Sequence, residues 1–255
     1  KFQTHIAEYE STPSEQFRVK IFPQDKTRYD YWKRTSFTKD EWQLIKDRVD
    51  EKGMVFISSP FSIEAAKLLE EIGIECWKVG SGEVTNKPLL DFLTTTKKPI
   101  ILSSGMSYLK ELENVVGRLK EKQASVVLLQ CTNKYPCPPE SVGLEMIMQY
   151  QSHFKIPSGL SDHSGILAPC IAAVALGAKV LEFHVTWSKK CFGPDVSSSL
   201  TIEEVSTLVK QVRYLDKANQ ASYSKDSQTG LMEDIRKLFT KSIVPKVNIK
   251  KGEKI

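Results

Sequence analysis

The sequence has no long apolar run and no glycine-rich nucleotide-binding motif. No apolar stretch approaches the roughly 20 residues that a membrane-spanning helix needs. Neither G-x-G-x-x-G nor G-x-x-x-x-G-K-S/T follows any expected strand, so nothing supports a dinucleotide or P-loop site. The chain starts at KFQT, without a methionine or a basic leader, and no signal peptide is visible. We therefore expect no membrane partner, and we interpret this start as a cut edge.

Cysteine and clustered positive charge are also scarce. The five cysteines are an odd number without repeated C-x-x-C spacing, which argues against a disulfide framework and a zinc knuckle. Reduced thiols of this kind are typical of a cytoplasmic protein. The net charge is +5, but the lysines are scattered, so we expect no nucleic-acid partner. The excess charge indicates either a mildly basic surface or attraction of a small anionic substrate.

Strands and helices alternate along most of the chain. Helical patterns follow short apolar runs, and such runs are typical of strands whose two faces are both covered. The alternation predicts a parallel sheet. KFQT is expected to end one strand, and the other expected strands are 54–59, 76–81, 99–104, 125–131, 156–162 and 179–185.

Seven strands is one fewer than the eight of a β/α barrel. We expect an α/β fold of the (β/α)8 TIM-barrel type over residues 1–217, with its first strand and helix missing from this chain. Residues 218–255 are expected to form a linker with a short helix. Residues 5–38 interrupt the alternation with a long, polar, aromatic connection. It is interpreted either as a lid over the site or as an irregular surface loop packed by its own aromatic residues.

Polar side chains stand where the expected strands end. In a β/α barrel the carboxyl ends of the strands carry the chemistry, and burying a charge without a partner is costly. We therefore expect these groups to converge on one face of the barrel. They are Lys1, Gln3, Ser58, Ser59, Lys78, Ser81, Ser103, Ser104, Asn133, Tyr135, Ser161, Asp162, His163, Glu182 and His184.

Several of these residues have a purely structural alternative. Lys78, flanked by apolar residues in CWKVGSG, needs an anion or a reactive partner, unless its ammonium group reaches solvent at the barrel mouth. Ser103 or Ser104 could be a helix N-cap instead. Asn133 is either a hydrogen-bonding group for a polyhydroxylated ligand or a helix-entry residue, and the motif alone does not decide.

Two of the four histidines, His163 and His184, end consecutive strands. Neighbouring strands lie roughly 4.8 Å apart, so both imidazoles could reach one ion at about 2.0 to 2.3 Å. Glu182 points to the same side of its strand as His184 because side chains alternate. A site with both imidazole and oxygen ligands suits manganese, iron, cobalt or zinc better than magnesium, which is usually bound by oxygen ligands alone.

Taken together, the motifs resemble those of the sialic acid synthase family, which makes N-acetylneuraminate and related nonulosonic acids. The resemblance runs from residue 1 to about residue 217, and the order and spacing of the motifs agree with the family. The motifs are KFQ, SSPFS, KVGSGEVTN, PIILSSGM, QCTNKYPCPP, GLSDHSG, ALGAKVLEFHVT and GPDVSSSL. The end of the chain, SIVPKVNIKKGEKI, resembles the start of the antifreeze-like domain that follows the barrel in this family.

The resemblance implies a metal-dependent condensation of phosphoenolpyruvate with an N-acetylmannosamine-type sugar, giving a nonulosonic acid and phosphate. It implies Glu182, Lys78 and Lys1 as catalytic residues, with Glu182 beside the reacting carbons. His163 and His184 would bind Mn²⁺ or Mg²⁺. Phosphoenolpyruvate would contact Lys1, Ser59, Lys78, Ser81, Ser103 and Ser161, and the sugar would contact Gln3, Asn133, Tyr135 and Asp195.

The chain also departs from the family pattern. We expect the family's first strand and most of its antifreeze-like domain to be missing from this chain, and Val196 stands where many members carry a histidine. We expect the complete enzyme to be a homodimer and this chain as given to have little or no activity. The alternatives are another phosphoenolpyruvate-dependent 3-deoxy-keto acid synthase, or an inactive sugar-binding fragment. The retained Lys78, His163, Glu182 and His184 argue against the inactive fragment.

Overall fold

The computed structural model describes residues 1–17 and 22–254. Residues 18–21, inside the predicted connection 5–38, and residue 255, inside the predicted linker 218–255, lie outside the described residues. The chain divides into two compact units, Lys1–Asp216 and Lys217–Ile255. The second unit contains the short helices α10 (Lys225–Leu231) and α11 (Glu233–Phe239).

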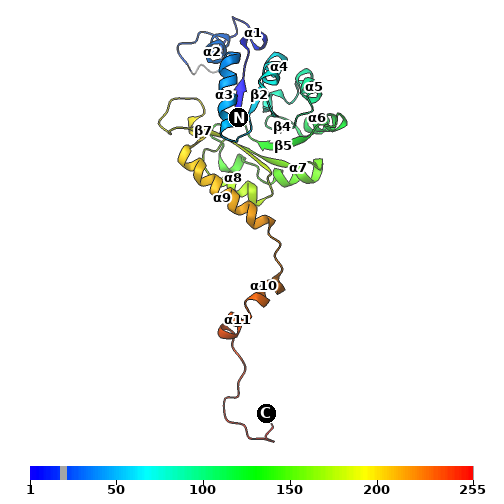
Figure 1. The fold of residues 1–255 in the computed structure, drawn as a ribbon, viewed down its shortest axis with the longest axis vertical. Coiled ribbons are helices and arrows are strands. Elements are labelled where there is room, and N and C mark those ends of the chain that lie inside the picture. The colour runs from blue at the N-terminus through cyan, green and yellow to red at the C-terminus, as the bar shows by residue number, and fades with distance from the viewer. Residues whose placement is uncertain (18–21, 255) are drawn as a thin grey trace. The chain divides into compact units, whose positions relative to one another are not determined.

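The first unit is built on one sheet of parallel strands that curl into a half-barrel (Figure 1). Each strand pairs with the next in the sequence, so β1 and β8 are the two ends of the strand order. The predicted α/β fold of the (β/α)8 type is confirmed. The strands are β1 (Phe2–Thr4), β2 (Ile57–Pro60), β3 (Cys76–Val79), β4 (Ile100–Ser103), β5 (Val126–Cys131), β6 (Ser158–Asp162), β7 (Val180–Thr186) and β8 (Ser199–Thr201).

The strand count differs from the prediction. Seven strands were expected in this chain, and the described residues contain eight. The additional strand, β8, has only three residues, Ser-Leu-Thr, and pairs with His184–Thr186 at the end of β7. Because it contains no apolar run, its sequence carries no strand signal.

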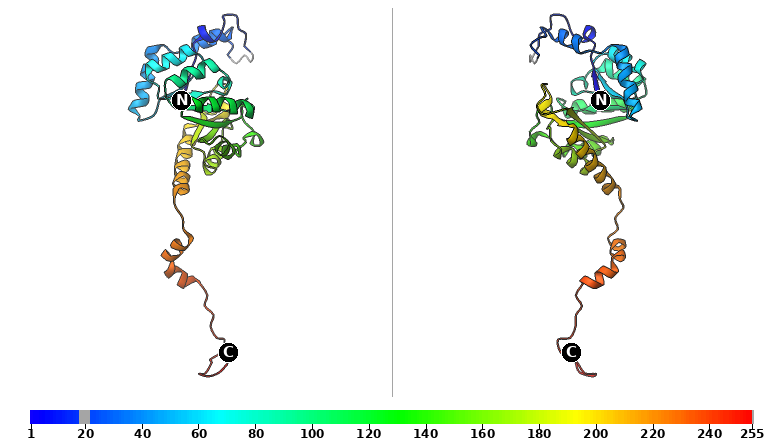
Figure 2. Two further views of the ribbon diagram at one scale, coloured as in Figure 1. Left: turned by 90° about the vertical axis from the view of Figure 1, so that its right-hand side faces the viewer. Right: turned by 60° about the vertical axis from the view of Figure 1, so that its left-hand side comes forward.

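Helices lie around the outer side of the curled strands, as the side views in Figure 2 show. In the first unit they are α1 (Ala7–Glu10), α2 (Arg28–Thr35), α3 (Lys39–Glu51), α4 (Ile63–Ile72), α5 (Lys87–Thr95), α6 (Leu109–Glu121), α7 (Met146–Phe154), α8 (Ala168–Ala175) and α9 (Ile202–Gln220, whose last residues belong to the second unit). The short 3₁₀ helices in the described part of the chain are η1 (Ser81–Glu83), η2 (Pro139–Ser141) and η3 (Val196–Ser198). None of the helices in the described ranges is both long and apolar enough to cross a membrane.

Helix boundaries follow local capping chemistry. Thr38 caps α3 through a capping box with Glu41. Helix α4 begins at Ile63, because Ser62 accepts a hydrogen bond from the Ala65 amide and Pro60 belongs to β2. After β5 the chain forms two helices, η2 and α7, which are separated by a segment in which Gly143 has φ 67°.

The main apolar core lies between the strands and the helices outside them. Its fully buried members include Trp77, Phe56, Leu69 and Leu128. The Trp77 indole donates to the Thr96 hydroxyl at 2.8 Å, so even its polar atom is satisfied. Alternate residues of the same strands point the other way, and this packing therefore orients the polar strand-end groups toward the inside of the barrel.

The connection 5–38 is more ordered than a plain irregular loop. Helix α2 starts with a capping box between Thr27 and Asp30. The imidazole of His5 stacks on Trp32 at 4.4 Å and on Phe61 at 4.1 Å between ring centroids. Aromatic packing, one of the two alternatives, is thus observed, and it ties the connection to β2 and the loop after it.

Gly159 generates a stability prediction, because its backbone lies against β7. A Cβ atom at this position would be 2.0 Å from the Val180 carbonyl oxygen. We expect Gly159→Ala to lower the free energy of unfolding by about 3 kcal/mol or more, as overpacking against backbone does. Urea unfolding followed by circular dichroism measures the change.

The matched control is Gly117→Ala in α6, where the added Cβ would have no atom within 4 Å apart from its chain neighbours and the backbone of its own helix. This variant is expected to gain about 0.5 to 1 kcal/mol from helix propensity. Equal stability of the Gly159→Ala variant and the native chain would contradict the close approach.

Candidate functional site

One cavity of about 200 Å³ gathers the predicted site residues. It lies among the strand ends and the loops that follow them, where a β/α barrel carries its chemistry. Every side chain predicted for catalysis, substrate or metal lines it: Lys1, Gln3, Ser59, Lys78, Ser81, Ser103, Asn133, Tyr135, Ser161, His163, Glu182, His184 and Asp195. The geometry thus brings together groups from seven separate strands or their following loops.

A carboxylate between two ammonium groups forms the centre of this cavity. Glu182 Oε1 is 3.1 Å from Lys1 Nζ, and its Oε2 is 3.4 Å from Lys78 Nζ. The Ser161 hydroxyl donates to the same Oε2 at 2.7 Å, and Lys78 also donates to Ser103 Oγ at 2.8 Å. Lys78 is only 3% exposed, so its charge is compensated by Glu182 rather than by water. Snorkelling to the barrel mouth is therefore wrong for Lys78.

These charges shift one another's protonation equilibria. Burial alone would raise the pKa of Glu182, but Lys78, Lys1 and the Ser161 hydrogen bond lower it to about 2. Burial lowers the pKa of Lys78, and the neighbouring Glu182 charge opposes that effect. Glu182 is therefore ionised at neutral pH and is flanked by two ammonium groups.

The two histidines lie side by side in the same cavity. Their ring centroids are 5.2 Å apart. His163 Nδ1 is 3.1 Å from the Thr132 carbonyl oxygen, and its Nε2 is 3.0 Å from the Tyr135 hydroxyl. Because a carbonyl only accepts hydrogen bonds, Nδ1 carries the proton and Nε2 accepts from the Tyr135 hydroxyl. His184 Nδ1 is 3.5 Å from an Asp195 carboxylate oxygen.

Burial also keeps both imidazoles neutral. It lowers the pKa of His163, with a further contribution from His184. It lowers the pKa of His184 as well, although Asp195 opposes this. Neutral imidazole is the form that ligates metal ions.

Three of the polar residues predicted at strand ends, Ser58, Ser104 and Asp162, do not line the cavity. Ser58 pairs with the Thr4 hydroxyl at 2.8 Å, Ser104 accepts from Tyr150 at 3.2 Å, and Asp162 accepts from the Ser164 hydroxyl at 2.7 Å. Each is the strand neighbour of a cavity residue and points to the opposite side. The N-cap alternative for Ser103 and Ser104 is wrong, because the N-cap of α6 is Tyr108.

Sequence reasoning missed four lining residues, Phe61, Gly80, Gly82 and Cys131. Cys131 is the last residue of β5, and this strand-end position is the sequence signal that could have identified it as a lining residue. Gly105 is a fifth omission: a Cβ there would be 1.9 Å from Asn133 Oδ1 and 2.8 Å from Ser81 Oγ. Only glycine leaves room for those two side chains.

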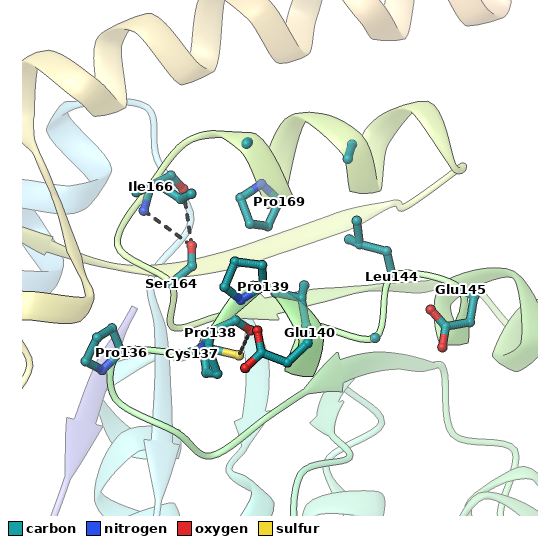
Figure 3. Close-up of a pocket in the computed structure, with 14 residues that line it drawn as sticks. Pro136, Cys137, Pro138, Pro139, Glu140, Leu144, Glu145, Ser164, Ile166 and Pro169 are labelled. Atoms are coloured by element: carbon teal, nitrogen blue, oxygen red, sulfur yellow. Dashed lines mark hydrogen bonds between the residues drawn. The ribbon is translucent and has the colours of Figure 1, made fainter.

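A larger cavity of about 800 Å³ lies elsewhere, between the proline-rich loop after β5 and the start of α8 (Figure 3). Prolines and aliphatic groups dominate its lining, with Glu140 and Glu145 as the charged residues. No lysine, arginine or histidine occurs among the described residues that line it. Despite its size, it lacks cationic groups that would bind an anion, and the smaller cavity is the better candidate.

The charge cluster generates a prediction about stability. Glu182→Gln would leave Lys1 and Lys78 without their shared counter-charge, and we expect a loss of about 3 to 5 kcal/mol in the free energy of unfolding. Lys78→Met should cost less, because Lys1 still pairs with Glu182. The double variant should be more stable than Glu182→Gln alone. Guanidinium unfolding at pH 7 measures all three, and additive losses would contradict the coupling.

The same cluster predicts a pH dependence. The pKa of Glu182 falls from 4.5 to about 2, so its contribution is complete above about pH 4.5 and is lost as the pH falls toward 2. The Glu182→Gln variant should therefore lack this part of the fall in the free energy of unfolding between pH 4.5 and pH 2. Glu203→Gln, at an exposed helix position, is the control and should unfold in acid like the native chain.

Comparison with known proteins agrees with this geometry. The chain is 39% identical over 203 residues to an N,N'-diacetyllegionaminic acid synthase of Campylobacter jejuni, a match that covers 78% of this chain and 60% of the relative. It is 36% identical over 228 residues to the Homo sapiens N-acetylneuraminate-9-phosphate synthase, with 89% and 63% covered. The chain therefore spans less than two thirds of the length of these relatives.

A solved structure with a similar fold is the N-acetylneuraminic acid synthetase of Leptospira borgpetersenii, in complex with citrate. Its TM-score is 0.75 at 28% identity, and the match covers 86% of this chain and 77% of that one. The family model described as the NeuB family matches residues 1–224, which include every residue of the cavity. The chain therefore belongs to the NeuB family, whose named relatives are synthases of sialic, legionaminic and pseudaminic acids.

Proposed function

We propose that this cavity binds phosphoenolpyruvate and an N-acetylmannosamine-type sugar and joins them into a nonulosonic acid, with release of phosphate. C3 of phosphoenolpyruvate attacks the aldehyde carbon of the open-chain sugar, which forms the new carbon–carbon bond and leaves positive charge at C2. Water then adds at C2, and phosphate departs by cleavage of its C–O bond. The proposed enzyme is thus a carbon–carbon bond-forming transferase.

Lysines and serines are the residues proposed to hold phosphoenolpyruvate. The ammonium groups of Lys1 and Lys78 line the cavity, and charge-assisted hydrogen bonds to phosphate and carboxylate are stronger than neutral ones. Ser59, Ser81, Ser103 and Ser161 add hydroxyl donors on the same walls. Glu182, ionised at neutral pH, is proposed to stabilise the positive charge at C2.

The sugar is proposed to bind beside this donor site. Gln3, Asn133, Tyr135 and Asp195 combine amide, phenol and carboxylate groups, which suit a ligand rich in hydroxyl groups. Asp195 stands next to His184, so the sugar would approach the two imidazoles. Phosphoenolpyruvate is thus proposed to lie next to the two lysines, and the sugar next to the two histidines.

The imidazole pair is proposed to hold a divalent ion. The two imidazoles are an incomplete ligand set, since within residues 1–17 and 22–254 no three His, Cys, Asp or Glu side chains converge as a ligand cluster, and substrate or water oxygens would have to complete the coordination. His163 Nε2 and His184 would be the protein ligands, and nitrogen ligands favour Mn²⁺ over Mg²⁺. When bound, the ion would supply a Lewis acid for the aldehyde oxygen of the sugar.

The gathering of Lys1, Lys78, Glu182, His163 and His184 in one cavity is the observation that carries this proposal. A 3-deoxy-keto acid synthase remains the second candidate. The truncated 3-deoxy-D-arabino-heptulosonate 7-phosphate synthase of Thermotoga maritima has a related fold, with a TM-score of 0.62 at 17% identity, and that likeness concerns the fold alone. The homodimer and the cytoplasmic location belong to the whole enzyme and stay predictions.

Calorimetric binding tests the proposal without requiring turnover, which matters for a chain that spans 60% to 63% of these relatives. Titration of phosphoenolpyruvate in the presence of Mn²⁺ is expected to show saturable binding. The double variant His163→Ala, His184→Ala should lose the Mn²⁺-dependent part of the affinity, at least tenfold. His153→Ala, which changes an exposed histidine on α7, is the matched control and should bind like the native chain.

Two outcomes would count against the proposal. Equal Mn²⁺-dependent binding by the native chain and the double variant would remove the metal assignment. Absence of phosphoenolpyruvate binding by a folded native chain would remove the donor site, and then the inactive sugar-binding alternative would be the better explanation.

A further inference from the structure

Strand β8 has little support from the sheet itself. It contains three residues, and in the described part of the chain it pairs with β7 alone. An edge strand leaves the backbone groups on its open side without ladder partners. Its ladder with β7 places Ser199 beside His184, and the Ser199 hydroxyl donates to the Asp195 carbonyl oxygen at 2.7 Å. The position of β8 therefore affects two residues of the candidate site, His184 and Asp195.

The ammonium group of Lys189 provides a further attachment for β8. Lys189 Nζ donates to the Gly165 carbonyl oxygen at 2.9 Å and also to the Ser199 carbonyl oxygen. Gly165 follows His163 by two residues, in the loop after β6, and Ser199 is the ladder partner of His184. Because β7 lies between β6 and β8 in the strand order, one ammonium group joins the two neighbours of the strand that carries His184.

The loop after β6 lies directly against the short helix η3. Gly165 has φ 72°, and a Cβ atom there would be 2.5 Å from the Ser197 carbonyl oxygen. The backbone of the loop that follows His163 thus meets the backbone of the segment that follows Asp195. A hydrogen-bonding group at this contact helps to fix the spacing between the two segments, and with it the spacing between His163 and Asp195.

Lys189 itself does not line the candidate cavity. Its ammonium group is 3.7 Å from Glu204 Oε2, which also accepts from the Thr201 amide at 2.7 Å. The Lys189 side chain is 41% exposed, and an ion pair at such a position contributes little by itself. Its hydrogen bonds to the two carbonyl groups are charge-assisted, and such bonds are stronger than neutral ones. Lys189 therefore acts on the site through the backbone that it holds.

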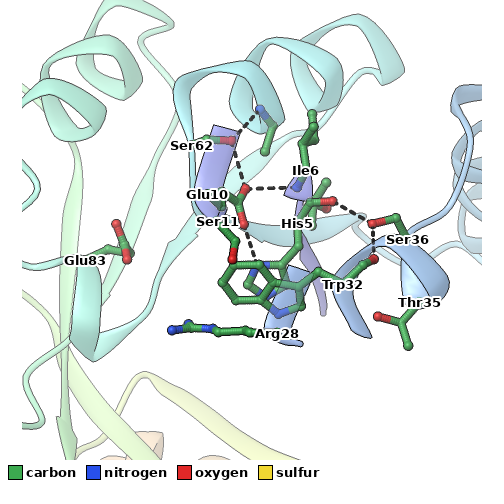
Figure 4. A network of polar contacts seen from close by, with 12 residues as sticks. His5, Ile6, Glu10, Ser11, Arg28, Trp32, Thr35, Ser36, Ser62 and Glu83 are labelled. Atoms are coloured by element: carbon green, nitrogen blue, oxygen red, sulfur yellow. Dashed lines mark hydrogen bonds and ion pairs between the residues drawn. The ribbon is translucent and has the colours of Figure 1, made fainter. Parts of the chain in front are cut away.

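The β1 end of the strand order is held by a separate network (Figure 4). The Glu10 carboxylate lies 2.6 Å from His5 Nδ1. It also accepts from the Ile6 amide at 3.0 Å and from the Ser62 hydroxyl at 2.9 Å. Ser62 lies in the loop after β2, so these contacts join the segment after β1 to that loop, and none of them includes Lys189. The part of the site that β1 and β2 carry is therefore held independently of Lys189.

We infer that Lys189 is a positioning residue that keeps the imidazole pair and Asp195 in the arrangement that receives the divalent ion and the sugar. This inference rests on the proposed function, which assigns the ion to the two imidazoles and the sugar to Asp195 and its neighbours. The two ammonium groups proposed to hold phosphoenolpyruvate lie at β1 and β3, far from β8 in the strand order. Loss of Lys189 should therefore weaken binding of the ion and the sugar and leave binding of phosphoenolpyruvate unchanged.

Removal of the ammonium group tests this role. Lys189→Met keeps an unbranched side chain but loses both hydrogen bonds, and the variant should fold because the side chain is 41% exposed. Calorimetric titration is expected to show a fall in Mn²⁺ affinity of about tenfold, as removal of groups that orient metal ligands does. The affinity for N-acetylmannosamine should fall as well, whereas the affinity for phosphoenolpyruvate, measured without metal, should stay at its native value.

Two further variants separate positioning from charge. Lys189→Arg retains a cationic side chain with several N–H donors and is expected to restore most of the Mn²⁺ affinity. Lys190→Met makes the same change of charge at the next residue, which is also exposed, and it should not weaken Mn²⁺ binding. Because removal of a positive charge by itself favours the binding of a cation, the expected fall in Lys189→Met has the opposite sign to a pure charge effect.

The outcomes separate this inference from the proposed function. Native Mn²⁺ affinity in Lys189→Met, no recovery in Lys189→Arg, or an equal fall in Lys190→Met would each overturn the positioning role. A parallel fall in phosphoenolpyruvate affinity would overturn it too, because it would indicate a general loss of stability. Absence of Mn²⁺ binding by the native chain would instead overturn the metal assignment of the proposed function, and the sugar affinity of Lys189→Met, measured without metal, would then decide the inference.

Discussion

The pairing of Glu182 with two lysines is the constraint on which the rest of the site depends. Lys78 is almost fully buried, and a buried charge is tolerated only with a nearby partner. Its partner, Glu182, lies on β7. The second ammonium group that contacts Glu182 belongs to Lys1, the residue before β1. The curl of the sheet must therefore bring β1, β3 and β7 together, and the serines and histidines on the intervening strands are carried into the same cavity.

Two kinds of support hold this arrangement. Below it, the strands are fixed by apolar packing around Trp77 and by close approaches such as Gly159 against Val180. Beside it, the ring stack of Phe61, His5 and Trp32 anchors the connection 5–38 to the barrel. A site framed by rigid strands and a stacked aromatic wall needs little rearrangement before its ligands bind, which reduces the entropic cost of binding.

Much of this could be predicted from the sequence. Buried parallel strands produce short apolar runs, and the polar residue that ends each run marks the barrel mouth, so Lys78, Glu182 and the two histidines stood out. The three-residue strand β8 could not be found, because it contains no such run. The stack of His5 on Phe61 also escaped prediction, since it arises from a contact between segments far apart in the sequence. Cys131 was passed over although its strand-end position was readable.

The contact between Lys1 and Glu182 has a consequence for how the chain reaches its folded state. Neighbouring strands such as β4 and β5 can pair early, because short loop closure costs little entropy. The carboxylate, in contrast, meets both of its ammonium partners only when segments from opposite ends of the barrel have come together. Binding competence thus arises at the last stage of assembly, and a partly folded chain presents strands and helices in place but a site that is still in pieces.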